Sequence, residues 1–274
     1  MAELNPVLGK ELRQRFRFWQ SAIILFLYLT VVGVFTLGFI YLQWQYAGVV
    51  FQPWRSMEIF VFLSITQLLL LAFVTPGLTA GTISGEREKQ TLNVLLTTHL
   101  TPGGIIVSKM LAACSFTLLL IIASLPLYAM IFLYGGIAPG QVLGVFGYYL
   151  VTMYLFAAVG MFCSTWFRRT GASTVTAYGL IFALGGGTGI LAAFIYQLNR
   201  MSDQWTGQES VNFCVQFLQN INPLLVLIRI MGENAVMGVE RVMFLPYWGV
   251  YTAFCLVVGT GLLLLSSRLL NPLK

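Results

Sequence analysis

One short interior segment carries the densest run of charged side chains inside this chain, and an apolar stripe at helical spacing follows it. Acidic residues open the segment, where they suit the positive end of a helix macrodipole. Leucines then recur at positions i, i+3 and i+4. Such a helix binds through ion pairs at one end and apolar packing along one face. The pattern predicts an amphipathic helix over residues 86–98, either as a contact for a partner or as a solvated interfacial linker. The residues that carry it are Glu86, Arg87, Glu88, Lys89, Leu92, Leu95 and Leu96.

The other reactive side chains form no catalytic or metal-binding pattern in the sequence. The single histidine, His99, follows the charged segment, and the four cysteines are scattered singly without metal-ligand or redox spacing. A protease in the bilayer would need a histidine or converging carboxylates at depth. The sequence also has no G-x-x-x-x-G-K-[ST] phosphate-binding loop. We therefore expect this chain to hold no catalytic residue, metal or cofactor.

Composition indicates a multi-pass membrane protein. Hydrophobic residues make up 58% of the chain and charged residues 9%, and the mean hydropathy is +0.84, far from the average of soluble domains. A helix of about 20 apolar residues crosses the hydrocarbon core. Uncharged intervals of that length, with Gly135–Gly140 as the turn between the third and the fourth, predict one all-α transmembrane domain over residues 1–274. The six predicted spans are residues 21–42, 59–85, 110–133, 142–166, 171–197 and 243–267.

Lysine and arginine fall mainly on one side of these spans. An even number of spans puts both termini on the same side, and the excess of basic residues on that side predicts cytoplasmic termini. Membrane topology thus explains the net charge of +6, and no nucleic-acid partner is expected. The termini side carries Lys10, Arg13, Arg15, Arg17, Arg87, Lys89, Lys109, Arg168, Arg169, Arg268 and Lys274, against Arg55, Arg200, Arg229 and Arg241 on the other.

The segment before the first span is amphipathic. Asn5 and Pro6 suit a helix cap and first turn, and basic residues then separate from apolar ones at helical spacing. We expect an in-plane helix over residues 5–19 that lies on the inner leaflet. The alternative is that these basic residues only flank the first span on its cytoplasmic side, which would also explain their positive charge. Its basic residues are Lys10, Arg13 and Arg17, and its apolar residues are Leu8, Leu12 and Phe16.

Small residues predict two places of close helix packing. Gly77, Gly81 and Gly85 recur at four-residue spacing after Pro76, a pattern that lets another helix approach closely. Residues 185–189 are glycine except for Thr188, which suits either packing or an unwound point around an ion or ligand. Packing is favoured because no acidic partner lies nearby in the sequence.

The connection over residues 198–242 is too apolar for a solvated external loop. It is predicted to return into the outer leaflet as one or two short re-entrant helices. Arg229 is expected to snorkel toward the head groups rather than line an exit.

The first half of the chain resembles the ABC-2 type permease family, the membrane subunits of a class of ATP-binding-cassette exporters. Asn222-Pro223-Leu224 before the last span is a weaker point of similarity, and Gln90 stands where the family usually has glycine. The residues that carry the resemblance are Asn5-Pro6, Lys10-Glu11-Leu12, Thr75-Pro76, Ala80, Ile83, Glu86-Arg87-Glu88, Thr91-Leu92, Leu95-Leu96, Leu100-Thr101-Pro102, Ile106-Val107, Lys109, Pro126 and Gly135-Gly136.

This resemblance implies a six-span half-transporter in the plasma membrane of a prokaryote, paired with a second permease chain as a homo- or heterodimer. Two cytoplasmic ABC ATPase subunits would bind ATP and Mg²⁺, and residues 86–98 would be the coupling helix that they push. An ion-coupled carrier or a channel is the alternative. Uncharged spans suggest lipophilic or amphipathic cargo. The coupling residues implied are Glu86, Arg87, Glu88, Thr91, Leu92, Leu95 and Leu96.

Overall fold

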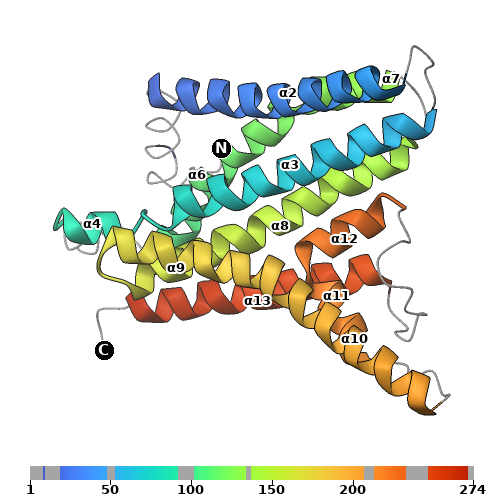
Figure 1. Cartoon of the computed structure of the whole chain (residues 1–274). Coiled ribbons are helices and arrows are strands. Elements are labelled where there is room, and N and C mark those ends of the chain that lie inside the picture. Colours follow the sequence, from blue (N-terminus) through green and yellow to red (C-terminus); the bar gives the residue numbers. More distant parts are fainter. Residues whose placement is uncertain are drawn as a thin grey trace.

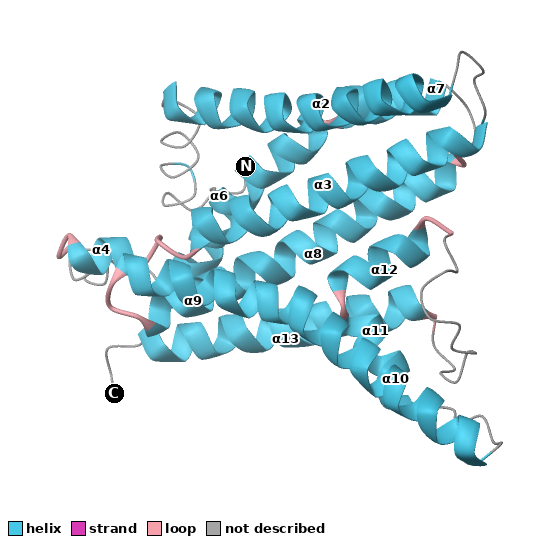
Figure 2. Ribbon diagram, viewed as in Figure 1, coloured by secondary structure: helices cyan, strands magenta, loops and turns pink. Residues whose placement is uncertain are grey.

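The computed structural model describes residues 9, 19–47, 53–91, 102–133, 137–206, 213–232 and 246–270, and within these ranges it contains helices and no strand (Figures 1 and 2). The longer helices are α2 (Trp19–Ala47), α3 (Pro53–Thr79), α6 (Pro102–Ala123), α8 (Pro139–Trp166), α9 (Thr170–Phe182), α10 (Thr188–Thr206) and α13 (Tyr247–Leu270). The shorter ones are α4 (Ser84–Glu88), α7 (Leu125–Leu133), the π-helix η1 (Ala183–Gly187), α11 (Phe213–Ile221) and α12 (Pro223–Ile230).

Six stretches in the described part are long and apolar enough to cross a membrane, which confirms an all-helical protein with six candidate spans. They are Ile23–Leu42, Met57–Glu88, Pro102–Phe132, Pro139–Trp166, Thr170–Met201 and Tyr247–Leu270. The third helix begins at Pro102, eight residues before the predicted start at residue 110, because proline suits the first turn of a helix. Lys109 therefore lies inside α6 and not at the boundary of a span.

Helix α8 is the centre of the bundle. It packs against α13, α3, α9 and α6, and Figure 1 shows it between α3 and α13. Its side chains Tyr149, Phe156 and Met161 are fully buried. By contrast, α2 and the run from α9 through α10 expose most of their apolar side chains, as expected of helices that face lipid or another membrane chain.

The closest helix contact lies at Gly160 of α8. A Cβ atom on this residue would stand 1.9 Å from Oγ1 of Thr79 and 3.3 Å from the backbone nitrogen of Ala80. Only glycine lets α3 and α8 approach this closely. The hydroxyl belongs to the last residue of α3 and the backbone nitrogen to the first residue after it, so the contact lies where the next segment of the chain begins.

The three glycines of the predicted ridge do not share one helix, because α3 ends at Thr79. A Cβ on Gly77 would lie 2.8 Å from the hydroxyl of Tyr178, and one on Gly85 would make an ordinary contact with Thr170 at 3.5 Å. Gly81 has no described atom within 4 Å of its Cβ position. Close approach of another helix at Gly81 stays a prediction.

Asn222 joins the glycine-rich π-helix to the bent pair α11 and α12. Its Oδ1 accepts the backbone N–H groups of Leu224 and Leu225 and so caps α12. Its Nδ2 donates to the carbonyl oxygen of Gly185 at 2.5 Å and to the hydroxyl of Thr188 at 2.9 Å. The glycine run thus serves a packing contact, since a Cβ on Gly189 would lie 3.0 Å from the same Nδ2 atom.

Helices α11 and α12 meet at 86° and together are apolar enough for one broken span or a re-entrant pair. They pack on α10, α13, α8 and α3. Snorkelling of Arg229 toward the head groups stays a prediction. Its guanidinium donates to Oδ1 of Asn220 at 2.7 Å and to Oε1 of Gln219, because a half-buried cation needs acceptors close by. Membrane re-entry of the pair stays a prediction.

The contact at Gly160 gives a first test. Gly160→Ala forces its new methyl group into Thr79, and overpacking of this kind costs about 1–3 kcal/mol. We expect a lower midpoint of thermal unfolding for the purified chain in detergent. Gly147→Ala on the same helix is the matched control, since no described atom lies within 4 Å of that Cβ position. Equal midpoints for the two variants would contradict the close contact.

Candidate functional site

The candidate site is the junction after α3, formed by the turn Ala80–Ile83 and helix α4, and we call it the α4 junction. It lies at the end of the bundle where α13 ends (Figure 1), and α4 packs against α9. The turn interrupts the helix close to Gly160, so backbone groups are freed in an apolar, buried setting where Ala80, Ile83 and Ser84 have no exposed surface. Such groups must find partners in neighbouring helices.

Two buried serines supply these partners. Oγ of Ser164, in the last turn of α8, accepts the N–H groups of Ile83 at 2.8 Å and Ser84 at 3.1 Å. These are among the donors that the first turn of a helix leaves without an intrahelical acceptor. Oγ of Ser173 in α9 donates to the carbonyl oxygen of Ala80 at 2.7 Å. The start of α4 is thereby fixed to both α8 and α9.

Glu86 ties α4 to α6 by an ion pair. Nζ of Lys109 donates to Oε1 of Glu86 at 2.7 Å, and the Lys109 side chain is 3% exposed and that of Glu86 25% exposed. Desolvating two charges is costly, and removal of either partner would take this ion pair away from the other charge. Oε2 of Glu86 is buried and has no hydrogen-bond partner among the described residues. The pair therefore fixes position more than it adds net stability.

The next two charged side chains reach two further helices. Nη1 of Arg87 donates to the carbonyl oxygen of Thr165 at 3.3 Å, one of the orphan carbonyl groups at the end of α8. Oε1 of Glu88 accepts the N–H of Thr170 at 2.8 Å and Oε2 accepts its hydroxyl at 2.9 Å. A carboxylate in this position caps α9 and suits the positive end of its macrodipole.

Consecutive residues of one short helix therefore contact three different helices: Glu86 contacts α6, Arg87 contacts α8 and Glu88 contacts α9. The predicted role of these side chains was contact with an ATPase. In the structure all three are engaged within the chain. Through these contacts a displacement of α4 would act on α6, α8 and α9 together.

The helix predicted over residues 86–98 is not continuous, because it is interrupted after its first three residues. Helix α4 ends at Glu88, and Gln90 adopts a left-handed conformation with φ of 57°. Thr91 then bonds back, since its N–H donates to the carbonyl oxygen of Glu86 at 3.0 Å. A glycine would adopt this conformation without steric cost, which gives a physical reason for the residue usual there in the resembling family.

The remaining predicted residues lie outside the description of the structure. These are the apolar stripe Leu92, Leu95 and Leu96, and the in-plane helix residues Leu8, Lys10, Leu12, Arg13, Phe16 and Arg17. Sequence reasoning missed Ser164, Thr165, Thr170 and Ser173, which contact the junction from 78 to 93 residues away in the chain. No local pattern could have found them, because a serine or threonine near a helix end is common.

A family model described as "ABC-2 family transporter protein" matches residues 6–265, nearly the whole chain. No curated protein matches the chain. The match spans every helix of the α4 junction, together with the α11 and α12 pair.

A charge exchange tests the ion pair. Glu86→Lys and Lys109→Glu each place like charges together in a buried site, and breaking a buried pair costs about 3–5 kcal/mol. We expect both single variants to have low yield and a low unfolding midpoint, and the double variant Glu86→Lys/Lys109→Glu to recover most of the loss. Lys89→Glu, at an exposed neighbouring position, is the control, and it should not rescue Glu86→Lys. A double variant no better than either single one would show that the pair does not hold α4.

The left-handed residue gives a second test. Gln90→Gly should raise the unfolding midpoint, because a non-glycine residue in this conformation costs about 1–2 kcal/mol. Lys89→Gly, at a φ of −78°, should instead lower it slightly, since glycine there only adds freedom to the unfolded chain. The measurement is thermal unfolding in detergent, and a stabilising Lys89→Gly with a destabilising Gln90→Gly would refute the assignment.

Proposed function

Because the chain belongs to the ABC-2 family of transporter proteins, we propose that it is the permease subunit of an exporter that separate ABC ATPase subunits drive through the α4 junction. The observation that carries the proposal is the contact of three consecutive charged residues with α6, α8 and α9. A multi-pass membrane protein of this family needs an element that receives force at one membrane face. The α4 junction has the connections for that task.

The distribution of charge supports a cytoplasmic position for the junction. Arg87, Lys109, Arg168, Arg169 and Arg268 belong to α4, to the first turns of α6, to the α8–α9 turn and to the last turn of α13. These elements meet at one end of the bundle (Figure 1). An excess of basic residues marks the cytoplasmic side, so an ATPase in the cytoplasm would reach α4. We place the chain in the plasma membrane of a prokaryote, with both termini inside.

The positions of the acidic residues favour ATP over a proton gradient as the energy source. Proton-coupled carriers keep titratable groups at depth in the membrane. Within the six apolar stretches of the described part, the only acidic residues are Glu58, Glu86 and Glu88, and each lies near an end of its stretch. The energy is then supplied as mechanical force from the cytoplasm, with ATP and Mg²⁺ bound by the partner.

Two parts of the contact segment have different roles. The apolar stripe Leu92, Leu95 and Leu96 packs against the ATPase, and α4 transmits its movement to the spans. A second permease chain, identical or related, covers the exposed faces of the mostly unburied spans, and lipid covers the rest. The cargo class that suits uncharged spans is lipophilic or amphipathic.

The test separates binding from transmission. Tagged chain is isolated from its host in mild detergent, co-purifying proteins are identified by mass spectrometry, and substrate-stimulated ATP hydrolysis is measured after reconstitution. We expect an ABC ATPase to co-purify with the wild-type chain and not with the Leu95→Asp variant, because a buried carboxylate breaks an apolar contact. Glu88→Ala should keep the ATPase bound but lower stimulated hydrolysis, since the exposed side chain is not needed for folding.

Thr174→Ala is the matched control for the second variant. Among the described residues, its hydroxyl bonds only to a carbonyl group of its own helix, α9, so both binding and stimulation should persist. Recovery of no ATPase from native membranes would turn the assignment toward an ion-coupled carrier or a channel. If the Glu88→Ala variant binds an ATPase and shows full stimulation, transmission of movement through α4 is contradicted. Only the assembly of the chain with an ATPase would then be supported.

A further inference from the structure

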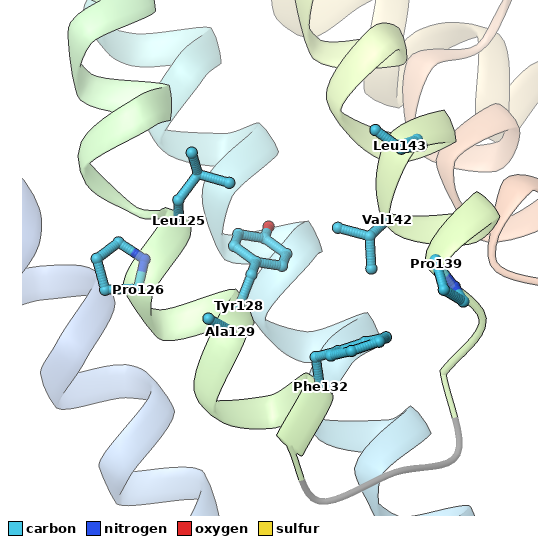
Figure 3. Close-up of a pocket in the computed structure, with 8 residues that line it drawn as sticks. All are labelled: Leu125, Pro126, Tyr128, Ala129, Phe132, Pro139, Val142 and Leu143. Carbon is cyan, nitrogen blue, oxygen red and sulfur yellow. The ribbon is translucent and has the colours of Figure 1, made fainter.

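An apolar groove of about 400 Å³ opens on the side of the bundle between α7 and the first turns of α8. The third span breaks at Ser124, where α6 ends and α7 begins, and Pro126 follows in the first turn of α7. The break sets α7 apart from α8 (Figure 3). The groove lies at the far end of the third and fourth spans from the α4 junction, because α6 and α8 both have their other ends there.

Apolar side chains form the walls of the groove. Ala129 and Phe132 line it from α7, and Val142 and Leu143 line it from α8 (Figure 3). The single polar group among the lining residues is the hydroxyl of Tyr128, which lies 3.1 Å from the hydroxyl of Tyr149 and 3.4 Å from that of Ser64. That hydroxyl is satisfied within the protein, so the groove offers water no partner.

The back wall is held in place. The ring of Tyr128 packs edge-on against Phe60 and Phe146, with centroid distances of 5.8 Å and 5.2 Å, and the residue is 2% exposed. Its hydrogen bonds tie α7 to α3 and α8. A side chain so constrained cannot swing outward to fill the groove, and unfilled apolar space forfeits dispersion contacts along its whole lining.

The medium outside the groove is lipid. Phe132 and Leu143 at its edge are 42% and 74% exposed, and both belong to apolar stretches long enough to span a membrane. Residues 110–166 contain no charged side chain. Protein interfaces usually surround an apolar centre with a polar rim. The described residues that line this groove include no charged side chain, and an alkyl chain needs only apolar contact.

From the groove's shape, lining and setting, we propose that it binds one acyl chain of a membrane phospholipid. The chain wedges between α7 and α8 and fills the space that the break at Ser124 creates. A bound chain supports the position of Tyr128 and, through it, the contact of α7 with α3 and α8. The site takes its membrane setting from the proposed function and is otherwise independent of it, since an acyl chain binds without ATP or an ATPase.

The experiment uses the purified chain in vesicles of phosphatidylglycerol, a fraction of which carries a photoreactive diazirine at the end of one acyl chain. After irradiation, lipid adducts are mapped by mass spectrometry. We expect adducts concentrated on residues 125–143. Ala129→Trp fills the groove and should reduce these adducts about tenfold, which corresponds to about 1.4 kcal/mol. Leu143→Trp fills it from the opposite wall and should act in the same way.

Met130→Trp is the matched control. Met130 is the next residue of α7 and is 53% exposed, but it does not line the groove, so labelling of residues 125–143 should persist. Adducts spread evenly over the exposed apolar faces of α2 and α10, or adducts that Ala129→Trp leaves unchanged, would overturn the proposal. Cross-links between two copies of the chain in place of lipid adducts would also overturn it and assign the groove to a chain–chain interface. Because the vesicles contain no ATPase, neither result bears on coupling through α4.

Discussion

A break in a helix within apolar surroundings needs partners from elsewhere in the fold, and the α3–α4 break organises one end of this bundle. Backbone groups that would bond within a continuous helix are freed at the turn, and leaving them unpaired in an apolar setting costs as much as a lost hydrogen bond. Ser164 and Ser173 meet that requirement. Ser164 can do so because Gly160 lets α8 approach the end of α3. The site and the packing of α3, α8 and α9 are thus consequences of one constraint.

The same constraint acts again at the π-helix. There the backbone ladder is shifted by one residue between α9 and α10, and the carbonyl oxygen of Gly185 bonds to Asn222. Asn222 in turn caps α12 with its other side-chain atom. The side-chain amide of Asn222 therefore hydrogen-bonds to backbone groups of two helices, η1 and α12. These bonds fix the position of the bend between α11 and α12 relative to the fifth span. In both breaks glycine permits the approach, and a polar side chain from a distant segment completes the hydrogen bonds.

The fold class could be predicted from the sequence because composition alone decides it. Long uncharged intervals leave no stable alternative to membrane-spanning helices. The charged segment at Glu86 was also visible, since a run of charges between apolar intervals is rare. The partners of that segment were not, because Lys109, Thr165 and Thr170 come from other helices and reach it only after those helices pack. The helix end at Glu88 was missed because the leucine stripe continues the helical period past a left-handed residue, and periodicity does not report a single φ angle.

The assignment of the charged residues to contacts within the chain changes how coupling through α4 can operate. If Glu86, Arg87 and Glu88 bound the ATPase directly, each engagement would exchange an internal bond for an external one, and the buried Lys109 would lose its ion pair with Glu86. Breaking a buried ion pair costs about 3–5 kcal/mol, a poor use of the energy of ATP binding. If they instead stay paired, α4 moves as a unit with its three helices, and the contact with the partner can be apolar and uniform. Under the proposed function, the internal pairs would determine which spans move, while the contact surface would determine only when they move.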